Sequence, residues 1–147
     1  MQIKFERDRS AGYLTNWAAR HFARVIDRKL RPLGLSSGQL PVFFALSAHA
    51  ALTQKALAEA AAIEQPTMAA TLARMERDGL IERKADPRDG RSALVSLTPG
   101  AVKKASAVLD AVHGGNAEAL AGLSGEERDQ LLRLLRRVIA NLEKSTA

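Results

Sequence analysis

The densest group of charged side chains lies between Glu82 and Gly100, in the stretch ERKADPRDGRSALVSLTPG. Four basic and three acidic residues surround one Asp-Pro-Arg-Asp-Gly turn. We expect Asp89 and Gly90 to form its tip, because glycine turns without a side-chain clash, with Arg88 and Arg91 on either side. Arginine at such a tip has the shape and charge to enter a narrow DNA minor groove.

The residues around this turn predict a β-hairpin. Apolar and polar side chains alternate from Ala93 to Leu97, which is typical of a strand that pairs back on its neighbour. We expect two strands and a loop longer than two residues, with Asp86 pairing to one of the arginines. The residues predicted to meet DNA from this hairpin are Arg83, Lys84, Asp86, Arg88, Asp89, Gly90 and Arg91. The alternative is a solvated charged turn with no partner.

A helix that starts at Pro66 supplies a second polar surface. Met68, Leu72 and Met75 fall on one side at the helical period, so they are expected to face the core. The opposite side is small, hydrogen-bonding and basic. The residues expected to bind DNA from this helix are Gln65, Pro66, Thr67, Ala70, Thr71, Arg74 and Arg77. Of these, Gln65, Thr67, Ala70, Thr71 and Arg74 are expected to face the bases. The alternative is an ordinary surface helix with a polar outer side.

Helices flank both features along the chain. Apolar residues recur at three- and four-residue steps over 12–31, 40–46 and 54–63, and Thr53 and the pair Ser36 and Gln39 provide helix N-caps. Thr98-Pro99 predicts the start of a long helix that Gly114-Gly115 should weaken or bend. Ser124 and Glu127 repeat the capping box before a final helix rich in leucine.

A short helix, a Pro-started helix and a basic hairpin in this order predict a winged helix-turn-helix, in which the second helix enters the DNA major groove. The fold class is therefore mainly α with a small β-hairpin wing. Residues near helix starts are further candidates for phosphate contact: Ser36, Ser37, Thr53, Gln54 and Lys55.

Composition favours the same partner. The 147 residues carry 22 Lys and Arg against 16 Asp and Glu, a formal charge of +6, which favours a polyanion such as nucleic acid. The chain has no cysteine, which excludes disulfides and thiolate metal sites, and no apolar run of membrane-spanning length. We therefore expect a cytoplasmic protein without a cofactor.

The hairpin also resembles a known family. Asp86-Pro87-Arg88, followed by Leu97-Thr98, is similar to the D-x-R…L-T wing signature of the MarR family of bacterial transcriptional regulators. LRPLGLSSGQL resembles the junction of that family's first two helices, and TQKALAEAAAIEQPTMAATLARMERDGLIER resembles its helix-turn-helix. The likeness covers most of the chain.

This resemblance implies one MarR-type domain over 1–147, with a winged helix-turn-helix at 33–100 and dimerisation helices at 1–32 and 101–147. It further implies a homodimer on a pseudopalindromic operator of double-stranded DNA, usually a repressor, acting in the bacterial cytoplasm at the nucleoid. A small aromatic or anionic effector would bind in a cleft, for which Trp17, His21 and Phe43 are candidates. Each of these three residues has core packing as its alternative.

Other functions find less support in the sequence. The only dense polar cluster is an exposed turn that cannot exclude water, which argues against an enzyme. His21, His49 and His113 are scattered and form no ligand pair at helical spacing, which argues against a metal sensor. The remaining alternative is a degenerate winged-helix adaptor or small-molecule-binding module that does not bind DNA.

Overall fold

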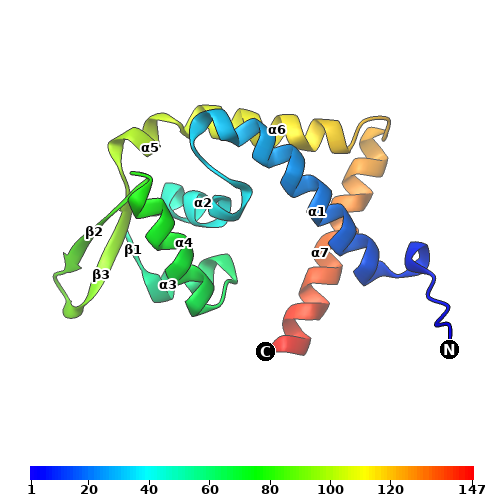
Figure 1. Ribbon diagram of the computed structural model, residues 1–147, viewed down its shortest axis with the longest axis horizontal. Coiled ribbons are helices and arrows are strands. Elements are labelled where there is room, and N and C mark those ends of the chain that lie inside the picture. Colours follow the sequence, from blue (N-terminus) through cyan, green and yellow to red (C-terminus); the bar gives the residue numbers. More distant parts are fainter. The chain divides into compact units, whose positions relative to one another are not determined.

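The computed structural model describes all residues 1–147, which form two compact units, Met1–Gly115 and Asn116–Ala147. The chain is mainly helical, with one small antiparallel sheet, as predicted. Figure 1 shows the order of the elements. The helices are η1 (Arg7–Arg9), α1 (Ala11–Leu30), η2 (Arg31–Leu33), η3 (Ser37–Gln39), α2 (Leu40–Ala48), α3 (Gln54–Ala61), α4 (Gln65–Arg77), α5 (Pro99–Lys103), α6 (Ala105–Ala119) and α7 (Gly125–Thr146). The strands are β1 (Leu52–Thr53), β2 (Ile81–Asp86) and β3 (Asp89–Leu97). None of the helices combines the length and the apolar character that crossing a membrane requires.

The helix-turn-helix consists of α3, a short turn and α4. The Thr53 hydroxyl accepts a hydrogen bond from the Ala56 backbone N–H at 3.2 Å and so caps α3 at its N-terminus, as predicted. The turn that follows passes through Ala62, which adopts a left-handed conformation with φ of 53°. A non-glycine residue pays about 1 kcal/mol or more for this conformation, so the packing on both sides must hold the turn in place.

The inner side of α4 forms the centre of the core. Met68, Leu72 and Met75 are fully buried, which confirms the predicted apolar side. Phe43 from α2 and Leu57 from α3 are buried in the same cluster. Because burial of one such side chain contributes about 1.5 to 3 kcal/mol, this cluster fixes the orientation of α4 and hence of its outer side.

The wing is a three-stranded sheet, where the sequence predicted two strands. The strand order is β1-β3-β2 and all pairs are antiparallel; Leu52 pairs with Val95, and Ile81 with Leu97. β1 has only two residues, too few to show the alternation that identifies a strand in a sequence. Through β1 the wing is joined to the start of α3, so the sheet and the helix-turn-helix share one framework (Figure 1).

The sequence predicted one long helix from Thr98-Pro99 that Gly114 and Gly115 weaken or bend. The chain is instead divided at Lys104, into α5 and α6. α6 runs through both residues without interruption, and Gly115 is buried. A Cβ added at Gly115 would clash with Ile26 Cδ1 of α1, whereas one at Gly114 would lie 3.5 Å from Lys29 Nζ. Gly115 is therefore used for close packing between α1 and α6.

This packing predicts opposite effects of substitution at neighbouring glycines. Gly115→Leu should lower the free energy of unfolding by about 1 to 3 kcal/mol, because the added side chain overfills a packed contact. Gly114→Ala should instead raise it by up to about 1 kcal/mol through helix propensity. Chemical denaturation of both variants checks the pair. Equal effects would exclude a special role for Gly115.

The second unit contains α7, whose first turn carries the predicted capping box. The Ser124 backbone N–H donates to Glu127 Oε1 at 2.8 Å, and the Glu127 N–H donates to Ser124 Oγ at 3.1 Å. The hydrogen bond from the Ser124 backbone lowers the pKa of the Glu127 carboxyl most, and a hydrogen bond from the Ser124 side chain lowers it further. No residue of α7 is buried in the single chain. Its exposed large apolar residues are Leu131, Leu132, Leu134, Leu135, Val138, Ile139 and Leu142.

Candidate nucleic-acid interface

The outer side of α4 presents a small, polar and basic surface. With the core side buried, the side chains left on the surface include those of six of the seven residues predicted to bind DNA from this helix: Gln65, Pro66, Thr67, Ala70, Arg74 and Arg77. Pro66 occupies the first turn, where its missing N–H is harmless, so the backbone can begin a helix there. A surface of this size and chemistry fits a DNA major groove.

Thr71 does not belong to this surface, and its prediction as a base-facing residue is wrong. It is only 3% exposed, and its hydroxyl donates a hydrogen bond to the Thr67 carbonyl within the same helix at 2.9 Å. On a helical wheel Thr71 lies next to Met75, so the core extends one position further around α4 than the apolar residues alone indicate. Thr71 therefore packs α4 against the core.

The turn of the wing also differs from its prediction. β2 ends at Asp86 and β3 begins at Asp89, so the loop contains only Pro87 and Arg88. Gly90 lies inside β3 and has no positive φ. Proline fits the first central position of a turn because its φ is already set, which explains why Pro87 and not Gly90 makes the tip. Arg88 is thus at the tip itself.

The two aspartates of the wing accept hydrogen bonds from backbone amides, whereas Asp86 was predicted to pair with an arginine side chain. Asp86 Oδ1 accepts from the Arg88 N–H at 2.9 Å, and Asp89 Oδ1 accepts from the Arg91 N–H at 3.0 Å. Asp86 Oδ2 also accepts from the Ser92 hydroxyl at 3.3 Å. These bonds fix the backbone of the turn. They leave the orientation of the guanidinium groups to other contacts.

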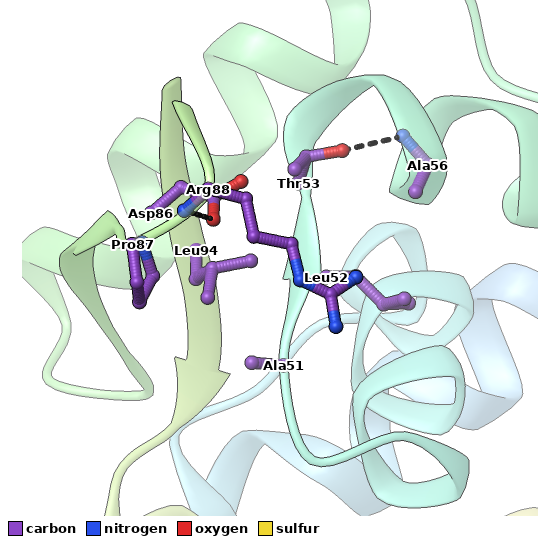
Figure 2. A pocket seen from close by; sticks show the side chains of 8 residues that line it. All are labelled: Ala51, Leu52, Thr53, Ala56, Asp86, Pro87, Arg88 and Leu94. Atoms are coloured by element: carbon purple, nitrogen blue, oxygen red, sulfur yellow. Dashed lines mark hydrogen bonds between the residues drawn. The ribbon is translucent and has the colours of Figure 1, made fainter. Parts of the chain in front are cut away.

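Arg88 lies along a pocket of about 470 Å³ beside the wing. Figure 2 shows its side chain extending from the turn, across the pocket and in the direction of Leu52. The lining residues are Ala51, Leu52, Thr53, Ala56, Asp86, Pro87, Arg88 and Leu94. The Arg88 side chain is exposed and lies beside the apolar residues that line this pocket.

A second pocket, of about 620 Å³, lies between the start of α3 and the other side of the wing. Lys55, Arg83 and Arg91 line it together with Asp86 and Asp89, so three basic and two acidic residues meet in this slot beside the start of α3. Arg83 Nε also lies 3.3 Å from Glu76 Oε2 of α4. The sequence predicted Arg83 as a phosphate contact but did not indicate this pairing, because the two residues meet only through the folded turn between α4 and β2. Lys84 is exposed on β2.

The predicted phosphate contacts near helix starts are in part committed to the protein. Ser36 forms the predicted capping box with Gln39, whose Oε1 accepts from the Ser36 N–H at 3.1 Å. The Ser37 N–H donates to Asp27 of α1. Gln54 donates to Gln65 Oε1 at 3.3 Å, so the starts of α3 and α4 are joined. Ser36 and Ser37 line a pocket together with Arg74, which places the end of α4 beside the start of α2.

Comparisons with known proteins agree with this geometry. Residues 33–92 match the model of the MarR family. The chain is 36% identical over 105 residues to the transcriptional regulator HosA from Escherichia coli O111:H-. The aligned residues cover 71% of this chain and 78% of HosA. The chain belongs to the MarR family. Its relatives are described as transcriptional regulators and not as enzymes.

Solved structures of transcriptional regulators share the fold over most of both chains. A probable transcriptional regulator from Pseudomonas aeruginosa superposes with a TM-score of 0.84 at 31% identity, covering 90% of this chain and 99% of that one. A mutant MarR from E. coli in complex with operator DNA superposes with a TM-score of 0.83 at 24% identity, covering 93% of this chain and 99% of that one. The regulator PcaV from Streptomyces coelicolor, in complex with its natural ligand, superposes with a TM-score of 0.81 at 24% identity, covering 95% of this chain and 98% of that one.

The residues that the MarR resemblance offered as a ligand cleft separate into two groups. Trp17 Nε1 donates to His21 Nε2 at 2.9 Å, and the Arg7 guanidinium carbon lies 4.4 Å from the centre of the Trp17 ring. Phe43 is only 1% exposed and lies in the core, stacked edge-on against Phe44. The core alternative therefore holds for Phe43, and Trp17 with His21 forms a separate polar-aromatic pair on α1.

Proposed function

We propose that this MarR-family regulator is a homodimer that binds a pseudopalindromic operator and represses transcription until a small ligand releases it. In this proposal α4 enters the major groove and the wing reaches the adjacent minor groove. Helices within 1–32 and 101–147 form the dimer. The protein would act in the bacterial cytoplasm, on the nucleoid.

The observation that carries the proposal is the exposed outer side of α4. Thr67 and Ala70 are small and leave room for base edges, and Arg74 adds a guanidinium that can donate two hydrogen bonds to guanine. The wing supplies Lys84, Arg88 and Arg91 for the neighbouring backbone and minor groove. A protein-binding adaptor would not require this combination.

Arg74→Ala tests the reading of bases. Operator affinity should fall by roughly 1 to 3 kcal/mol, and discrimination at one base pair of each half-site should relax, because a bidentate contact to guanine is lost. The measurement is binding to a set of duplexes that carry single base changes in the operator. A variant whose sequence preference matches the wild type would exclude Arg74 from base recognition.

The effector proposal rests on the Trp17 and His21 pair, with PcaV in complex with its natural ligand as structural analogy. A tryptophan ring beside a histidine and Arg7 suits a flat compound with a negative group. We expect an aromatic acid to quench Trp17 fluorescence and to lower operator affinity. Trp17→Leu should abolish the response while leaving DNA binding intact. A panel of phenolic and aromatic acids without effect would remove this part of the proposal.

A further inference from the structure

The end of α4 and the base of the wing are joined by contacts that the DNA-contact surface does not explain. Glu76, in the last turn of α4, pairs with Arg83 on β2, with 3.3 Å between Oε2 and Nε. The two side chains are 49% and 32% exposed, so this ion pair lies at the edge of the protein surface. Glu76 is also an acid on the helix that would face DNA, where a negative charge opposes binding.

A second contact fixes the same junction from the opposite strand. The Thr98 hydroxyl donates to the Gly79 carbonyl at 2.7 Å, and the Thr98 N–H donates to the Leu80 carbonyl at 3.0 Å. Thr98 Oγ1 also accepts from the Ala101 N–H, so it caps α5 at the same time. Gly79 has a φ of 74° and ends α4. The chain can therefore rotate little at Gly79 unless these bonds break.

The wing tip lies far from this junction, so a small change of angle at the junction moves the tip by several ångströms. Strand β2 has six residues, so the tip lies about 20 Å beyond the junction at about 3.3 Å per residue. A rotation of about 10° at the junction would move Arg88 by about 3.5 Å. The minor groove is only about 6 Å wide, so a movement of this size would take the Arg88 side chain out of the groove.

We propose that the Glu76–Arg83 ion pair is a specificity-determining link, which holds the wing at the angle that lets α4 and Arg88 occupy neighbouring grooves together. This inference rests on the proposed function, since it assigns Arg83 a positioning role within the same DNA-binding surface. In this proposal the role of Glu76 is to orient the wing, and it pairs with Nε of Arg83, a residue that also lines the slot beside α3.

The alternative roles of the two residues predict different binding data. A phosphate contact by Arg83 would contribute equally to all DNA sequences and add about one unit to the salt slope. An unpaired Glu76 would weaken binding to all sequences alike. A positioning link changes the ratio of operator to nonspecific affinity, because only the operator complex requires both grooves to be occupied in register.

The experiment uses the full-length protein and a duplex that it selects from a random-sequence library, with a scrambled duplex of equal length as the nonspecific probe. The variants are Glu76→Gln, Arg83→Gln and the exchange Glu76→Arg with Arg83→Glu. Glu82→Gln on the same strand is the matched control, because it removes an exposed acid outside the ion pair. Thermal melting confirms that each variant is folded.

We expect each single variant to lower the operator-to-nonspecific ratio about threefold to fivefold, the range for a partly exposed ion pair. The exchange variant should restore the ratio to within about twofold of wild type, and Glu82→Gln should leave it unchanged. Equal losses on both probes for Arg83→Gln, without rescue by the exchange, would overturn the link in favour of a phosphate contact. Equal gains for Glu76→Gln and Glu82→Gln would overturn it in favour of simple repulsion. A wild-type protein that selects no preferred sequence would instead overturn the proposed function itself.

Discussion

Leu135→Asp should convert the dimer into a monomer and lower operator affinity at least about 100-fold. Leu135 lies at the centre of the apolar side of α7, and the seven exposed apolar residues of this helix fall within roughly 160° of its circumference at about 100° per residue. A surface of this kind on one chain calls for a partner, and in the proposed homodimer a second copy supplies it by two-fold symmetry. A charge placed in its middle would have to be buried without a counter-ion.

The loss of DNA affinity follows from the loss of the second half-site. Two linked recognition helices bind with an effective concentration that raises overall affinity by about 10²- to 10⁴-fold over one alone. Ala140→Asp is the matched control, since it adds the same charge to the same helix but on the polar side. Sedimentation velocity at micromolar protein gives the oligomeric state. A monomeric wild-type protein, or a dimeric Leu135→Asp variant, would contradict the dimer assignment.

Arg88→Ala should weaken operator and nonspecific DNA alike, by about tenfold, and make the salt slope shallower by about one unit. Arg88 is at the tip of the turn, where the hydrogen bond from its N–H to Asp86 Oδ1 fixes its backbone. Its guanidinium rests over a pocket and can turn outward to displace counter-ions from DNA (Figure 2). The dimer should remain intact, because the change leaves α7 untouched.

Variants at Asp86 separate positioning from charge. Asp86→Ala removes the acceptor for the Arg88 N–H and should weaken DNA binding by less than Arg88→Ala does. Asp86→Asn keeps an oxygen acceptor at the same place, so it should bind DNA as well as wild type or slightly better. In an Arg88→Ala background, Asp86→Ala should cost almost nothing further. Fully additive losses would show that Asp86 acts independently of Arg88.

Local signals in the sequence account for the elements that were predicted correctly. Thr53 and Ser124 cap their helices because a side-chain oxygen three residues before a free backbone N–H is enough to form that bond. Met68 and its neighbours identify the buried side of α4 because the helical period is a property of the backbone. The order of a short helix, a Pro-started helix and a basic hairpin joined these elements into a winged helix-turn-helix.

The features that were missed depend on competition between local signals or on tertiary contacts. At the wing tip, Asp89-Gly90 and Pro87-Arg88 both favour turns, and the proline forms the turn. Thr71 lies at the edge of the apolar side of α4, where only the packed neighbours decide burial. The pairing of Glu76 with Arg83 requires the path of the chain through Gly79, which no spacing in the sequence expresses.

Selection of bound fragments from a random duplex library, followed by salt titration of the winning sequence, tests operator recognition by α4 and the wing most directly. We expect a pseudopalindrome whose half-sites lie one helical turn apart, about 10 base pairs between centres. It should be bound at least about 10³-fold more tightly than scrambled DNA, with affinity that falls steeply as salt increases. Recovery of no common sequence, together with binding that is insensitive to salt, would contradict DNA recognition by this surface.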